Sequence, residues 1–140
     1  MYYLKKYHKT LSIILIITVL SLMNTSKIEP KDISLIPHFD KIVHFLMYFT
    51  LGFTFMFEYY LHHHKTIKRV SKILVLPLFY GALMEVLQFS ITSYRGADWL
   101  DMLANTCGIF AAYFTVRAFR NNIFIKKWML FPLTKPLFKA

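Results

Sequence analysis

The sequence predicts an all-α, polytopic membrane protein with four transmembrane helices and with both termini on the cytoplasmic side. First, 56% of its 140 residues are hydrophobic, more than soluble domains usually carry. Second, several stretches approach the roughly 20 apolar residues that a helix needs to span a bilayer while satisfying its own backbone hydrogen bonds. Third, lysine and arginine are divided unequally between alternate connecting segments, which predicts an orientation. We expect a single domain over residues 1–140.

The first two helices are expected over about residues 7–24 and 41–61. The apolar run Leu11–Met23 follows three lysines and resembles the hydrophobic region of a secretory signal. No clear small-x-small cleavage site follows the run, so we expect this helix to be retained. The apolar run of the second helix carries only His44 and Glu58 as ionisable residues, which is typical of a span.

The third and fourth helices are expected over about residues 72–92 and 98–119. Pro77 lies within the third, and we expect a kink near it because proline has no amide to bond the preceding turn. The fourth is polar in its first half and apolar in its second, so taken alone it would be a weak candidate for a span. Residues 121–140 are too charged to cross, and we expect them to form an interfacial cytoplasmic tail.

The basic residues predict the orientation of these helices. With the N-terminus inside, thirteen lysines and arginines lie on the cytoplasmic side and four lie outside, and positive residues are retained on the cytoplasmic side. The formal charge of +10 is then a topology signal, with attraction to anionic lipid as a consequence, and no nucleic-acid motif is present. We therefore expect a multi-pass protein of the cytoplasmic membrane. The four outside residues are Lys27, Lys31, Lys41 and Arg95.

Polar residues gather at the external ends of the last three predicted helices. Asp40 and His44 are four residues apart, so they share a helix face and the carboxylate can orient the imidazole. Glu85 and Gln88, three apart, share a face of the next helix. Because a charged side chain in a bilayer is costly, we expect these groups to face the bundle interior as one site. The candidate site comprises Asp40, Lys41, His44, Glu85, Gln88, Arg95, Asp98, Asp101 and Asn105.

A structural interpretation of the same residues stays open. Asp98 is placed to be the N-cap of the fourth helix, and Asp101 to form an interhelical pair with His44. No metal ligands and no cofactor are assigned, because the three successive histidines at 62–64 point in different directions on a helix. Glycines on the polar faces are expected to let helices approach closely. These glycines are Gly52, Gly81 and Gly108.

Three blocks of the sequence resemble the VanZ-like family of bacterial membrane proteins. Each motif alone is weak, but all three occur in family order between Pro37 and Gly108. One departure is the segment 91–94, where many members carry proline or glycine. The resemblance implies a bacterial membrane location, and it implies a link to teicoplanin resistance because the family's named member has one. The blocks are Asp40-Lys41-x-x-His44-Phe45-x-x-Tyr48 with Gly52, Gly81-x-x-x-Glu85-x-x-Gln88, and Arg95-x-x-Asp98-x-x-Asp101-x-x-x-Asn105-x-x-Gly108.

Three functions are compatible with this sequence. The first is protection of the cell envelope by an outward-facing polar site that binds a polar headgroup or a glycopeptide antibiotic. The second is a membrane-embedded hydrolase or transferase acting on a lipid-linked cell-wall precursor. In that enzyme His44 would be the general base, oriented by Asp40, and Asp101 or Glu85 the acid or a ligand for Mg or Mn. The third is a structural subunit in which the polar stripe joins helices.

Overall fold

The computed structural model describes residues 6–23, 38–63, 67–91 and 98–131, and throughout these ranges the chain is helical with short turns. The all-α prediction is therefore confirmed for the part of the chain that is described. The helices are α2 (His8–Leu22), α3 (Phe39–His63), α4 (Ile67–Lys72), α5 (Val75–Ile91), α6 (Trp99–Phe119) and α7 (Ile123–Leu130).

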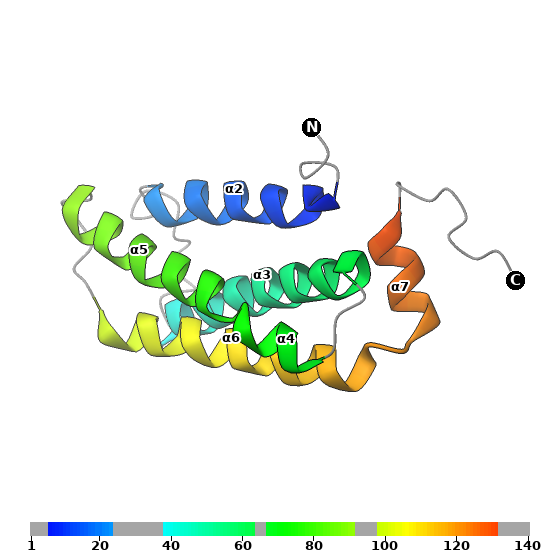
Figure 1. Ribbon diagram of the computed structural model, residues 1–140. Coiled ribbons are helices and arrows are strands. Elements are labelled where there is room, and N and C mark those ends of the chain that lie inside the picture. Colours follow the sequence, from blue (N-terminus) through cyan, green and yellow to red (C-terminus); the bar gives the residue numbers. More distant parts are fainter. Residues whose placement is uncertain (1–5, 24–37, 64–66, 92–97, 132–140) are drawn as a thin grey trace, which may run out of the picture.

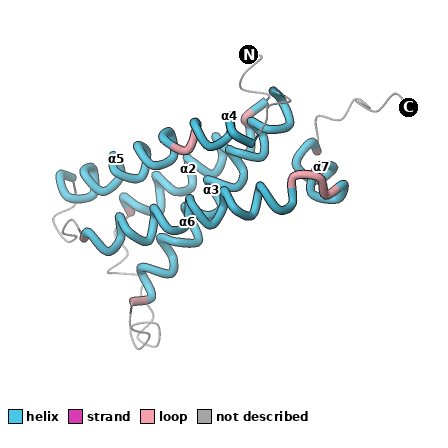
Figure 2. Tube along the Cα trace, turned by 60° about the horizontal axis from the view of Figure 1, so that its bottom comes forward, coloured by secondary structure: helices cyan, strands magenta, loops and turns pink. Residues whose placement is uncertain are grey.

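The long helices form an antiparallel bundle around α3, which contacts α2, α4, α5, α6 and α7. Figure 1 shows α3 and α6 running in one direction and α2 and α5 in the other. The first turns of α3 and α6 therefore lie at the same end as the last turns of α2 and α5, and the start of α2 lies with α4 and α7 at the other end. Figure 2 shows the same stacking of the long helices from a second direction.

The contact between α3 and α6 is the most extensive in the bundle, and small residues make it possible. A Cβ added at Gly108 would lie 2.9 Å from the amide nitrogen of Phe49 and closer still to the carbonyl oxygen of Phe45. A Cβ added at Gly52 would lie 3.2 Å from the Cβ of Ala112. The absence of side chains at these glycines thus allows the two backbones to approach closely, as small residues do in membrane helix pairs.

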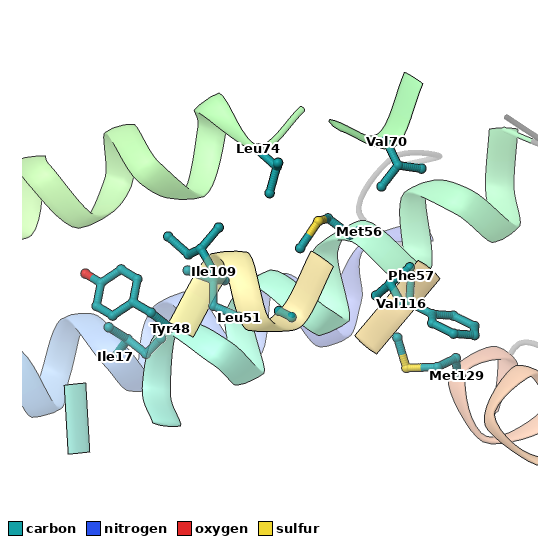
Figure 3. Packing of buried hydrophobic residues seen from close by; sticks show 11 residues of the cluster. Ile17, Tyr48, Leu51, Met56, Phe57, Val70, Leu74, Ile109, Val116 and Met129 are labelled. Carbon is teal, nitrogen blue, oxygen red and sulfur yellow. The ribbon is translucent and has the colours of Figure 1, made fainter. Parts of the chain in front are cut away.

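The core is apolar over most of the bundle length (Figure 3). Tyr48, Leu51 and Phe57 on α3 pack with Ile109 and Val116 on α6 in one continuous cluster. The outward faces are apolar as well, unlike those of a soluble protein. Exposed apolar side chains include Leu15, Ile16 and Val19 on α2, Leu46 on α3, Phe79, Val86 and Phe89 on α5, and Phe110 and Phe114 on α6.

Among the described residues, two helical segments are long and apolar enough to cross a membrane, Phe39–His63 and Val70–Ile91. The apolar helix α2 has 15 residues, which at 1.5 Å per residue is about 22 Å, less than the roughly 30 Å hydrocarbon core. α6 carries the polar stripe in its first half, as expected, and is not among the two. The described residues therefore contain two candidate membrane-spanning helices, and four spans remain a prediction.

A kink was expected near Pro77, and the helix is interrupted slightly earlier in the chain, between α4 and α5. α4 ends at Lys72 and α5 begins at Val75, so Pro77 is in the first turn of α5. The carbonyl oxygen of Ile73, which a residue at 77 would bond in a continuous helix, accepts instead from the amide of Leu76 at 3.1 Å. Proline fits a first helical turn because amides there need no partner within the helix.

The tail begins with the short helix α7. The Asn122 side chain caps α7 by accepting from the amides of Phe124 and Ile125. Lys9 on α2 donates from Nζ to the carbonyl of Trp128 and lies 4.5 Å from the centre of its ring. These contacts attach α7 to the end of the bundle opposite the candidate site. The rest of the expected tail, residues 132–140, lies outside the described residues.

Candidate functional site

The predicted polar residues meet where α3 and α6 begin and where α5 ends. Lys41 and His44 come from α3, Glu85 from α5, and Asp101 and Asn105 from α6. The last four of these are almost fully buried; the His44 residue, for example, is 2% exposed. We call these residues, together with Asp40 and Asp98, the polar cluster.

Lys41 is the centre of the outer half of the polar cluster. Its ammonium lies 2.7 Å from Asp40 Oδ2 and 2.7 Å from Asp101 Oδ1, and it also pairs with Asp98 Oδ2. Asp101 is buried, whereas the Asp40 and Asp98 side chains are partly exposed. One cation therefore connects the first turns of α3 and α6 and partly neutralises a buried carboxylate, which would be costly to bury alone.

His44 is the centre of the inner half of the polar cluster. Its Nδ1 is 3.0 Å from Asn105 Oδ1 and 3.7 Å from Glu85 Oε1, and its Nε2 is 3.8 Å from Asp101 Oδ2. Asn105 Nδ2 donates to Glu85 Oε1 at 2.9 Å. Asn105 is thus a bridge between the imidazole on α3 and the carboxylate on α5.

Asp98 has two roles at the rim of the polar cluster. It is the N-cap of α6, accepting from the amide of Leu100 at 2.9 Å, and it pairs with Lys41. The hydrogen bond from Lys41, followed by that from Leu100, lowers the pKa of the Asp98 carboxyl from its ordinary value. Asp98 therefore stays ionised at neutral pH.

The structure differs from the sequence-based expectation for the His44 imidazole. The residue hydrogen-bonded to the His44 imidazole is Asn105, while Asp40 pairs with Lys41. A residue four positions before a histidine shares its helix face but does not have to touch it, and a neighbouring cation attracts the carboxylate more strongly. Arg95 lies outside the described residues, so its place in the site remains a prediction.

Gln88 belongs to a neighbouring contact. Its Nε2 donates to the backbone carbonyl of Ser21 at 2.9 Å, which joins α5 to α2 beside the polar cluster. Ser21 was not predicted, although a signal exists: the buried residues Thr10, Ile17 and Ser21 are spaced seven and four apart, so the polar members lie on one face of an apolar helix.

A second buried polar contact, also missed from the sequence, lies toward the other end of the bundle. The hydroxyl of Thr10 donates to Glu58 Oε2 at 2.6 Å and its amide at 3.3 Å. This contact joins α2 to α3 and makes Glu58 a structural residue. It also provides a buried carboxylate, distant from the polar cluster, for comparison in experiments.

The charge of the polar cluster decides what it can bind. Four carboxylates and one ammonium leave its described residues with a formal charge of −3 when His44 is neutral. Adding Arg95 to the sum would still leave it negative. A negatively charged, buried site favours a cation or an amine over a phosphate or a free carboxylate.

Comparison with known families agrees with the sequence motifs. The profile of the family described as VanZ/LLP1 matches residues 3–120, which include all four long helices and the whole polar cluster. No curated protein and no solved structure matches the chain. Because the matched region covers most of the 140 residues, the chain belongs to the VanZ/LLP1 family.

Proposed function

We propose that this protein crosses the bacterial cytoplasmic membrane four times, with both termini inside, and protects the cell envelope against glycopeptides such as teicoplanin by binding a polar ligand in the polar cluster. Family membership and the two apolar helices support a membrane location. Exposed apolar side chains on α2 and α6 support two further spans. The start of α2 and the whole of α7 lie at the same end of the bundle, as an even number of crossings requires (Figure 1).

The observation that carries this proposal is the burial of the polar cluster between three helices whose other buried residues are mostly apolar. Charged groups inside a bilayer cost several kcal/mol. Buried ion pairs are often no more stabilising than apolar residues of similar volume. Helix packing alone would therefore be served by apolar residues at Lys41, His44 and Asp101, and their presence at the external end favours a working site.

The test is growth of a glycopeptide-sensitive Gram-positive host that expresses the protein, in teicoplanin and in vancomycin. His44→Ala and Asp101→Asn are compared with Glu58→Gln, which removes a buried carboxylate distant from the polar cluster. We expect the wild type and Glu58→Gln to raise teicoplanin tolerance and the two cluster variants to lose it at equal membrane abundance. Unchanged tolerance with abundant wild-type protein would refute the envelope role, and loss of abundance in only the cluster variants would assign them a structural one.

A lipid-directed enzyme is the second candidate, and the environment of His44 supports it. The imidazole is held by Asn105 and lies beside the carboxylates of Glu85 and Asp101, an arrangement that can position a general base. Purified protein is incubated with a labelled lipid-linked cell-wall precursor, with and without a divalent metal. A product that His44→Ala abolishes would establish the enzyme, and no turnover under either condition would remove this candidate.

A further inference from the structure

Three side chains of metal-ligand type converge within the polar cluster. His44 on α3, Glu85 on α5 and Asp101 on α6 are all buried, and each offers one ligand atom such that these atoms lie within 4.8 Å of one another. Ligand atoms bound at roughly 2.1–2.6 Å from a common ion stand about 3–5 Å apart. The three helices thus hold these atoms close to the spacing that one ion requires.

Hydrogen bonding by Asn105 orients the histidine for this role. Its amide nitrogen donates to Glu85, so its oxygen faces His44 and accepts from Nδ1, which assigns the proton of the neutral ring to that nitrogen. The lone pair is then on Nε2, which faces Asp101 Oδ2 at 3.8 Å. Metal-bound histidines are commonly oriented in this way, by a partner on the other ring nitrogen.

The polar cluster contains a second set of carboxylates, and this set already pairs with an ammonium. Asp40, Asp98 and Asp101 also bring carboxylate oxygens together, but Lys41 Nζ pairs with all three. Lys41 bonds Asp101 through Oδ1, whereas Oδ2 is the oxygen that faces His44. Lys41 therefore supplies the cation of the outer group and at the same time fixes Asp101 for the inner one.

The Tyr48 hydroxyl is an independent indication of a ligand. Tyr48 is 1% exposed, and among the described residues its hydroxyl has no hydrogen-bond partner. The residue follows His44 by one helical turn, and its ring lies against Gly81, one turn before Glu85. Figure 3 shows the ring extending from α3 with its hydroxyl directed toward the end of the bundle where the polar cluster lies. A buried hydroxyl without a partner is costly, and a water molecule bound to an ion would be a suitable partner.

We propose that His44, Glu85 and Asp101 bind one divalent cation of the Mn²⁺ class, with Asn105 as a positioning residue. One nitrogen and two carboxylates suit Mn²⁺ better than zinc. Two anionic ligands neutralise a divalent ion, which a low-dielectric site between membrane helices requires. This inference rests on the proposed function, since it identifies the ion through which the site would contact an oxygen-rich ligand.

The test is titration of the purified, tag-free protein with Mn²⁺ in an uncharged detergent, with free Mn²⁺ followed by electron paramagnetic resonance. We expect saturable binding of one ion per chain. His44→Ala and Asp101→Asn should weaken this binding at least tenfold, whereas Glu58→Gln should leave it unchanged. Circular dichroism and gel filtration verify that each variant is folded, and the wild-type titration is decisive on its own.

Absence of saturable binding to the folded wild type at millimolar Mn²⁺ would overturn the assignment. Binding that both cluster variants retain would overturn it as well. The outcomes are separable from those of the envelope role. If the protein raises teicoplanin tolerance through the polar cluster but binds no Mn²⁺, only the ion is rejected. If the wild type binds Mn²⁺ and the variants do not, but the wild type gives no teicoplanin tolerance, only the envelope role is rejected.

Discussion

Gly108→Ala tests whether the close approach of α3 and α6 holds the bundle and the polar cluster together. The added Cβ would lie 2.9 Å from Phe49 N and closer to Phe45 O, and both are backbone atoms that no side-chain rotation can move away. To restore ordinary contact distances, the helices must separate by several tenths of an ångström to about 1 Å. Such separation would lengthen contacts between α3 and α6 in the polar cluster.

The expected destabilisation follows from two opposing effects. Overpacking a tight contact costs about 1–3 kcal/mol, and more where backbone must move, while alanine is favoured over glycine in a helix by about 1 kcal/mol. We expect Gly108→Ala to lower the free energy of unfolding by about 2 kcal/mol, roughly a 30-fold shift in the folding equilibrium. Gly52→Ala is the matched control, because its nearest neighbour is the Ala112 Cβ at 3.2 Å and a small adjustment suffices.

The assay is unfolding in mixed micelles of increasing SDS fraction, followed by circular dichroism for the wild type and both alanine variants. The midpoint for Gly108→Ala should lie clearly below the other two, while Gly52→Ala should differ from the wild type by less than about 1 kcal/mol. Equal stability of the two variants would contradict the backbone contact on which the α3–α6 packing rests.

Three further predictions concern buried and rim charges. Lys41→Met leaves the buried Asp101 without its ammonium and should cost about 3 kcal/mol in the same SDS titration; a loss below about 1 kcal/mol would contradict the pairing. Thr10→Val removes the hydroxyl of α2 that donates to Glu58 and leaves the longer bond from the Thr10 amide. It should cost about 1–3 kcal/mol, an effect that a Thr10→Val, Glu58→Leu double variant should partly reverse. Because the folded-state pKa of Asp98 is lowered, its stabilising contribution is present at neutral pH and is lost as the pH falls through that pKa. Asp98→Asn keeps the N-cap, and it should remove this part of the loss of stability below about pH 4.

The helices themselves were predictable because their signals are local. Runs of apolar side chains and the basic residues between them predict helices and their order without knowledge of any contact. The same holds for faces: spacings of three and four placed Asp98, Asp101 and Asn105 on one stripe of α6, and Asp98 is the N-cap that its position suggested. The three motif blocks likewise identified the family that the profile match shows.

Contacts between helices could not be predicted in the same way. Residue spacing shows which groups share a face, but the rotation and the depth of one helix against another depend on the whole interface, here on Gly108 against the α3 backbone. For this reason the spacing of Asp40 and His44 did not reveal that the His44 imidazole bonds Asn105 and that Asp40 pairs with Lys41. The buried pair of Thr10 and Glu58, 48 residues apart, was missed for the same reason.

Composition, periodicity and motif order are properties of the chain alone, so they sufficed to predict the helical class, the family and the set of polar residues available for a site. Which of these residues meet depended on how the helices pack. It divided the polar cluster into an outer group around Lys41 and an inner group around His44. That division follows from close packing, since glycine contacts between α3 and α6 bring side chains 61 residues apart within hydrogen-bonding distance.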